Sequence, residues 1–223
     1  LLESLPMGGI LVLFTIYNRV DTVILQYFKG SAAVGLYGVA YRVFEVLVLG
    51  AAYFANSILP LISSLAKTDR RRLGEVYRKS FVVLLVLGVT VATVNFIFAP
   101  LAIAILGGGD FAPSVGILRL LSLALLMSYF NHLNGYTLIA LGKQWYSLTI
   151  AVIALTVNLT LNWLFIPLFS YQAAAFITFV TEGLIVVLSL IFIKRELGVI
   201  PSLGDVPKVI LELVAKRGKI FEV

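Results

Sequence analysis

The fold of this chain is decided by residues 5–28, which read LPMGGILVLFTIYNRVDTVILQYF. The run is long enough to cross a bilayer, since about 20 apolar residues span the hydrocarbon core as a helix. It nevertheless holds Arg19 and Asp21, and the next apolar run holds Arg42 and Glu45 within Tyr-Arg-Val-Phe-Glu, residues 41–45. Ionised side chains are costly at membrane depth, and a chain that keeps them there is expected to use them. These residues predict a polytopic membrane protein with a polar pathway or pocket.

The composition supports a membrane protein and excludes several kinds of site. The 223 residues are 61% hydrophobic and only 13% charged, whereas a soluble domain carries about 25% charged residues. The chain has no cysteine and one histidine, His132, which excludes disulfides, thiolate metal sites and a multi-histidine metal centre. We therefore expect no metal, no cofactor and no catalytic site. The net charge of +6 is explained better by basic loops at a membrane face than by a nucleic-acid partner.

Apolar runs along the chain predict an all-α fold with six transmembrane helices. Together they form one lobe over 1–197, and 198–223 form a cytoplasmic tail that is either a short interfacial helix or truncated sequence. The chain begins without an initiator Met or a basic leader, so we expect it to start partway through a larger protein. The expected spans are 5–28, 33–61, 81–106, 115–141, 147–167 and 172–193.

The distribution of basic residues predicts the orientation of the spans. Of the 17 Lys and Arg residues, 13 fall on one face, among them the strongly basic 67–79 link, and 1 falls on the other. An excess of this size marks the cytoplasmic side. Both termini are therefore expected in the cytoplasm, with the Gly-Gly-Gly-Asp turn at 107–110 outside, in a plasma (inner) membrane. Three arginines lie within spans: Arg19, Arg42 and Arg119.

The four charges of the first two spans are expected at one depth. At about 1.5 Å per residue, Arg19 and Asp21 in the outgoing span match Arg42 and Glu45 in the returning span to within about a turn. One interpretation is structural: the arginines pair with the carboxylates and lock the two helices together. The other is functional: the arginines also bind an anionic group, because the guanidinium fork matches phosphate oxygens. The two interpretations are compatible, since an ion pair that exchanges partners with a ligand can act as a gate.

Two further charges are weaker candidates. Arg119 lies near the outer end of the fourth span and is expected to extend to the interface. Glu182 lies near the middle of the sixth span without a local partner, so it is either a cavity or proton-binding group or a neutral, hydrogen-bonded carboxyl. Asn131, His132 and Asn134 are expected to form hydrogen bonds between helices.

An ordered set of short motifs resembles the second half of polysaccharide-biosynthesis flippases, the O-antigen-type members of the multidrug/oligosaccharidyl-lipid/polysaccharide exporter superfamily. The resemblance covers nearly all of 1–197. It departs at Phe-Ser-Tyr-Gln, 169–172, where the family has a Gly, and in the tail after Gly198. The motifs are Leu-Pro at 5–6, Tyr-Asn-Arg-Val-Asp at 17–21, Val-Gly-Leu-Tyr at 34–37, Ala-Tyr-Arg-Val-Phe-Glu at 40–45, Leu-Pro at 59–60, Gly-Asp-Phe-Ala-Pro at 109–113, Ala-Leu-Gly-Lys-Gln at 140–144, and Leu-Asn at 161–162 with Ile-Pro at 166–167.

The resemblance implies a MATE-like fold of two six-helix lobes around a central cavity, of which this chain is the second. It also implies that alternating access moves a polyprenyl-diphosphate-linked oligosaccharide between leaflets. The implied partners are that lipid, the bilayer and the missing N-terminal lobe. Arg19 and Arg42 would face the cavity, with Asp21, Glu45, Arg119 and Glu182 as further binding or gating residues.

Three other functions remain as alternatives. A cation-coupled multidrug exporter of the same fold would need an unpaired carboxylate within the spans, and Glu182 is the best candidate. A membrane-embedded glycosyltransferase or ligase would need acid/base residues or a metal in sizeable loops, and the loops here are short. A non-transporting membrane scaffold would need none of these charges for transport.

Overall fold

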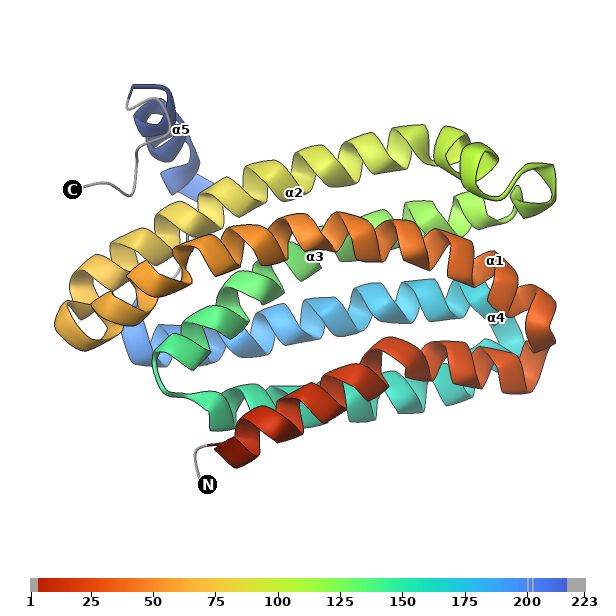
Figure 1. The fold of residues 1–223 in the computed structure, drawn as a ribbon, viewed down its shortest axis with the longest axis horizontal. Helices are drawn as coiled ribbons and strands as arrows, with labels where there is room; N and C mark the ends of the chain where they lie inside the picture. Colours follow the sequence, from red (N-terminus) through yellow and green to blue (C-terminus); the bar gives the residue numbers. More distant parts are fainter. Residues whose placement is uncertain (1–3, 200, 202, 216–223) are drawn as a thin grey trace.

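The computed structural model describes residues 4–199, 201 and 203–215 of the chain, and within them the regular structure is helical (Figure 1). Two short 3-10 turns, η1 and η2, connect longer helices. The elements are α1 (Ser4–Thr68), α2 (Arg70–Leu106), η1 (Gly109–Phe111), α3 (Ser114–Ala140), α4 (Gln144–Leu197), η2 (Leu203–Asp205) and α5 (Val206–Ala215).

Six separate spans are not confirmed, because the described residues contain four helices that are long and apolar enough to cross a membrane, α1 to α4. The difference lies in α1 and α4, each of which joins two helices across one non-helical residue, Gly30 (φ 77°, ψ −178°) and Ser170 (φ 55°, ψ −140°). The chain reverses direction at both places, so each helix forms two antiparallel arms (Figure 1). We call them the first and second arms of α1 (4–29 and 31–68) and of α4 (144–169 and 171–197). Hydropathy locates apolar runs but does not show that one residue can reverse a helix.

The basic segment expected as a link over 67–79 is helical. α1 continues to Thr68, and α2 begins at Arg70 after the single residue Asp69. Asp69 caps α2, since its side chain accepts a hydrogen bond from the Arg72 amide at 3.0 Å. The segment is helical because arginine and lysine favour helix. The sequence-based span was too short because an apolar run marks only the part of a helix that lies in hydrocarbon. The basic residues therefore occupy the first turns of α2.

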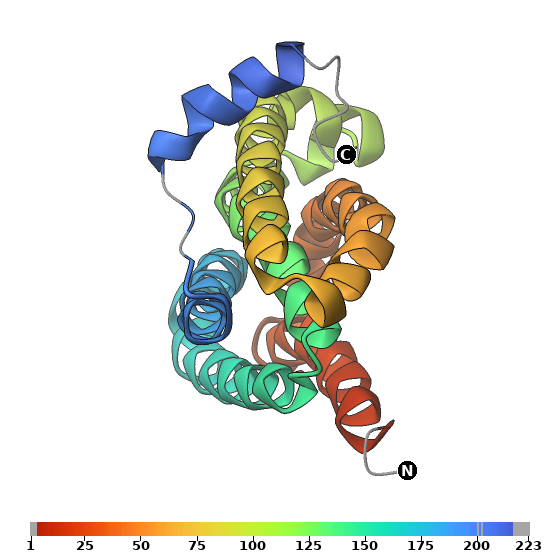
Figure 2. The same ribbon diagram turned by 90° about the vertical axis from the view of Figure 1, so that its left-hand side faces the viewer.

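Helix α3 packs against α1, α2 and α4 and forms the centre of the bundle (Figure 2). Its leucines Leu121, Leu125 and Leu133 are fully buried. Asn134 accepts a hydrogen bond from the Tyr77 hydroxyl at 2.8 Å and donates one to Ser189 at 2.8 Å, which confirms the hydrogen bonds between helices expected for this residue. The polar core thus holds α2, α3 and α4 in one register.

Ion pairs gather where the chain passes from α1 to α2, from α3 to α4, and out of α4. Glu196 lies 2.7 Å from Lys143 and 3.9 Å from Arg70. The hydrogen bond to Glu196 raises the pKa of Lys143. These contacts place three parts of the chain that are distant in sequence at the same end of the bundle.

Helix α5 crosses α2 on the outside of the bundle near that end (Figure 2). Glu212 of α5 pairs with Lys79 of α2 at 2.5 Å, and Val209 is buried. The tail thus contains a helix at Val206–Ala215. The rest of the expected tail, 216–223, lies outside the described residues.

Candidate functional site

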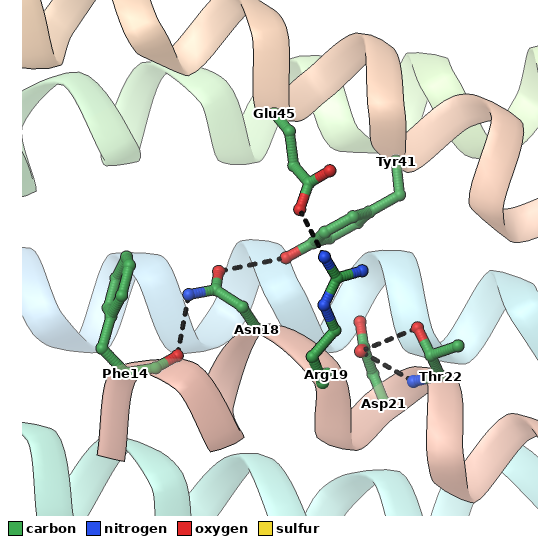
Figure 3. Close-up of polar contacts among 7 residues, drawn as sticks. All are labelled: Phe14, Asn18, Arg19, Asp21, Thr22, Tyr41 and Glu45. Atoms are coloured by element: carbon green, nitrogen blue, oxygen red, sulfur yellow. Dashed lines mark hydrogen bonds and ion pairs between the residues drawn. The ribbon is translucent and has the colours of Figure 1, made fainter. Parts of the chain in front are cut away.

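The first candidate site is formed by the two arms of α1. Arg19 on the first arm lies 4.0 Å from Glu45 on the second, and the two side chains are 69% and 39% exposed. Figure 3 shows the Arg19 guanidinium extending across the gap between the arms toward Glu45. Beside this pair, the Tyr41 hydroxyl donates to Asn18 at 3.4 Å. The expected pairing of a cation and an anion across the first two spans is thus present for Arg19 and Glu45.

Arg42 lies on the second arm three residues before Glu45 and is exposed. Among the described residues it forms no ion pair. It belongs to an exposed stripe at helical spacing with Val46, Leu49 and Tyr53. The expected pairing of Arg42 with a carboxylate is therefore not seen among the described residues.

Arg19 also lies in an exposed apolar stripe. On the first arm the neighbouring positions of the stripe are Val12, Ile16, Val23 and Tyr27, all exposed. An arginine facing lipid tails at this depth would be unfavourable. The face of α1 that carries Arg19 thus combines four large apolar side chains with one cation.

Asp21 does not join the arginines, which corrects the sequence-based pairing. Its side chain is buried and accepts hydrogen bonds from the Tyr37 hydroxyl and from the Thr22 amide, the latter at 2.7 Å. The Tyr37 hydroxyl in turn lies 3.5 Å from Thr178 of α4. Two residues along a helix are about 200° apart around its axis, so Asp21 faces the core where Arg19 faces outward. Asp21 therefore connects the two arms of α1, and through the Tyr37 hydroxyl it also connects them to α4.

Glu182 in the second arm of α4 is buried but not isolated. Tyr17 of α1 donates to its Oε1 at 3.2 Å, and Ser128 and Asn131 of α3 each donate to its Oε2 at 2.8 Å. Asn131 also donates to the Glu182 carbonyl at 2.9 Å. The sequence predicted no partner nearby in the chain, and the donors indeed come from α1 and α3, as in the hydrogen-bonded alternative.

A cavity of about 360 Å³ opens beside Glu182 and is lined by both arms of α1, both arms of α4 and helix α3. Most of its lining is aliphatic or aromatic, with Glu182, Tyr17 and Asn131 at its polar wall. His132 also lines it and contacts the Ser128 carbonyl at 2.9 Å. An apolar cavity with a few converging polar groups is the usual form of a small-molecule site.

Arg119 of α3 belongs to neither group. Its guanidinium lies 5.2 Å from the centre of the Phe96 ring, and its Nε donates to the Phe96 carbonyl at 3.3 Å. This cation–π contact with α2 explains how the charge is held at the edge of the bundle. It is a local contact between two helices.

Sequence reasoning missed the tyrosines that organise both sites. Tyr17 connects α1 to Glu182 of α4. Tyr37 and Tyr41 connect the second arm of α1 to Asp21 and Asn18 of the first arm. Tyr37 and Tyr41 are one helical turn apart with stacked rings. The four-residue spacing of Tyr37 and Tyr41 is visible in the sequence. Their hydrogen-bond acceptors are not, because these lie many residues away along the chain.

Comparisons with known proteins agree with this architecture. A protein of Haloferax volcanii described as "Probable flippase AglR" is 31% identical over 201 residues, which are 85% of this chain and 40% of the relative. The "Capsular polysaccharide biosynthesis protein CapF" of Staphylococcus aureus is 25% identical over 198 residues, 86% of this chain and 49% of that protein. The chain thus spans about half the length of the curated relatives it matches.

Solved structures show the same fold. A MATE structure in the straight conformation superposes with a TM-score of 0.77 at 19% identity, over 91% of this chain and 46% of that one. A MOP superfamily transporter from Pyrococcus furiosus gives 0.74 at 22% identity over the same shares. The family model MatE matches residues 6–164. The chain therefore belongs to the MatE family.

Proposed function

We propose that the chain is one lobe of a flippase that moves a polyprenyl-diphosphate-linked oligosaccharide across the plasma membrane by alternating access. The names of two relatives, a probable flippase and a capsular polysaccharide biosynthesis protein, support this substrate class. The half-length match to transporter structures supports a partner lobe, missing here, that closes the other side of the pathway.

The observation that carries the proposal is the exposed pair of arginines on α1. Arg19 has a weak, solvent-accessible ion pair and Arg42 has none among the described residues. A guanidinium can exchange a carboxylate for a diphosphate at little cost when the first pair is exposed. The diphosphate and sugars would otherwise lose their hydration in hydrocarbon, which costs many kcal/mol.

The basic residues indicate how the lobe is oriented in the membrane. Lys67, Arg70, Lys143 and Lys194 come from separate segments that meet at one end of the bundle (Figure 1). The positive-inside rule assigns this end to the cytoplasm. Both termini of the chain would then be cytoplasmic, with Gly30 and Ser170 at the outer end.

The test replaces Arg19 and Arg42 with alanine, one at a time, in the full-length parent. Arg42→Ala is the sharper variant because it breaks no described ion pair. We expect surface polysaccharide per molecule of transporter to fall about tenfold or more, as charged hydrogen bonds of about 1.5–3 kcal/mol are lost. Membrane protein level should stay normal.

Arg71→Ala is the matched control. Arg71 is exposed in the first turn of α2 and pairs with Glu75 at 3.6 Å, outside the apolar segment. It should leave polysaccharide unchanged. Normal polysaccharide in both Arg19→Ala and Arg42→Ala, at normal protein level, would exclude the transport role and favour a scaffold.

A second candidate function, a cation-coupled multidrug exporter, is favoured by Glu182. A carboxyl group beside an apolar cavity suits a lipophilic cation or a coupling proton. Purified parent protein in vesicles with a proton or sodium gradient would test it. Gradient-driven export of an organic cation that is lost in Glu182→Gln would support this function over the first.

A further inference from the structure

The outer face of α5 is apolar and has no described protein partner. The inner face is fixed by Val209, which is 6% exposed, and by the Glu212–Lys79 pair at 2.5 Å. On the opposite side Leu211 is 70% exposed and Ile210 is 39% exposed, with Pro207 and Ala215 also exposed. This ten-residue helix therefore has two distinct faces. One face packs on α2, and the other is apolar and points away from the bundle.

The attachment point places α5 at the edge of the hydrocarbon layer. The apolar run of α2 begins at Phe81, two residues after Lys79. Lys79 therefore lies about 3 Å along the axis from the start of this run. Figure 2 shows α5 crossing the bundle axis instead of continuing it, which is the direction of a helix lying in the plane of a membrane interface.

Basic residues lie on both helices that meet at this position. Lys208 is exposed on α5, and Arg72 and Arg78 lie in the first turns of α2. Within the part of the chain that the structure describes, none of these three forms an ion pair. Unpaired cations next to an exposed apolar face are complementary to anionic lipid headgroups above acyl chains.

We propose that α5 is an interfacial anchor whose Leu211 face inserts among the lipids of one leaflet, while Lys208, Arg72 and Arg78 bind anionic headgroups. The anchor needs the membrane-crossing bundle but is independent of what the lobe transports. The anchor would fix the depth at which the α1–α2 end of the bundle sits in the membrane. This depth would then depend on the anionic lipid content of the leaflet.

The absence of cysteine allows a clean test with single labels. Leu211→Cys and the control Thr68→Cys each carry one environment-sensitive fluorophore. Thr68 is exposed in the α1–α2 turn, which extends farther from the middle of the bundle than α5 (Figure 1). The full chain is reconstituted in vesicles of phosphatidylcholine, alone or mixed with phosphatidylglycerol.

We expect lipids brominated near the headgroup to quench the label at residue 211 several-fold more than the label at residue 68, and aqueous iodide to do the reverse. Equal iodide quenching at both positions would overturn the proposal. So would protection of residue 211 from both quenchers, because a second protein surface, either another copy or the partner lobe, would then cover α5.

The charge component is tested separately. Phosphatidylglycerol should shift the emission of the label at residue 211 to the blue, and the combined change Lys208→Gln and Arg72→Gln should remove at least half of that shift. An undiminished shift would overturn the assignment of these residues as headgroup ligands. Thr68, Leu211 and Lys208 are exposed and Arg72 is half-exposed, so the labels and substitutions leave the core intact.

Discussion

At the scale of single residues, neighbouring positions on α1 have different roles because a helix points them in different directions. Arg19 faces outward and meets Glu45 at 4.0 Å (Figure 3), whereas Asp21 faces the core and meets Tyr37. The exposed pair contributes little to stability, since surface ion pairs contribute about 0–1 kcal/mol. The buried carboxyl depends on its donors, because an unsatisfied buried polar group is costly.

Tyr37→Phe should therefore destabilise the lobe by about 1–3 kcal/mol, since it removes the hydroxyl donor of Asp21 and leaves the carboxyl buried. Thermal unfolding of the purified protein in detergent would measure the effect. Tyr41→Phe is the matched control, because it removes only the 3.4 Å contact with Asn18. Equal melting temperatures for Tyr37→Phe and the unmodified protein would show that Asp21 does not need this donor.

At the scale of helices, the two reversals are made by single residues with positive φ. Gly30 has φ 77° and Ser170 has φ 55°. Glycine adopts such a conformation without steric cost, whereas the Cβ of a serine makes the same conformation sterically unfavourable. The position where the family resemblance predicted a glycine is therefore the place where this chain holds a strained residue.

Ser170→Gly should stabilise the protein by roughly 1 kcal/mol through relief of this strain, and Gly30→Ala should destabilise it by about 1–3 kcal/mol. The melting temperatures of the two variants should move in opposite directions. Gly35→Ala is the control: Gly35 lies inside the second arm of α1 and an added Cβ meets nothing within 4 Å. A lower melting temperature for Ser170→Gly would contradict the account of the α4 reversal.

The Lys143–Glu196 pair between helix ends should give a pH-dependent contribution. Because the hydrogen bond to Glu196 raises the pKa of Lys143 above its ordinary value of 10.5, the contribution is complete below that pH and is lost as pH rises through the higher folded value. The stability deficit of Lys143→Gln should be the same at neutral and mildly alkaline pH and should shrink at still higher pH. Lys194→Gln, at an exposed lysine without a described ion pair, is the control in parallel melting curves.

At the scale of the whole molecule, the described bundle carries exposed stripes on both arms of α1. The chain covers 46% of two of the matched transporter structures, and the α1 stripes with Arg19 and Arg42 are open on the described lobe. A pathway between two lobes cannot be closed alternately by one of them. The same stripes are the surface that a partner lobe would approach.

Under the proposed function, expression of this chain alone should not restore surface polysaccharide to cells that lack the full-length parent, because the proposed pathway lies between two lobes. Co-expression with the other half as a separate polypeptide should restore at least part of it. The chain with Arg42→Ala, co-expressed in the same way, serves as the inactive control. Restoration by the chain alone would show that the lobe forms a complete pathway, for instance by pairing with a second copy.

Sequence patterns determined the all-helical membrane fold, the family resemblance and the positions of the charges within the apolar runs, because apolar runs and the charged residues inside them are local features of the sequence. Arg19 with Glu45 was also predictable, since a hairpin brings equal depths together. Tertiary structure alone decided that Asp21 turns inward, that Glu182 has donors from α1 and α3, and that one residue each at Gly30 and Ser170 replaces a loop. Those outcomes depend on rotation around helix axes and on contacts between distant segments, which one-dimensional periodicity does not fix.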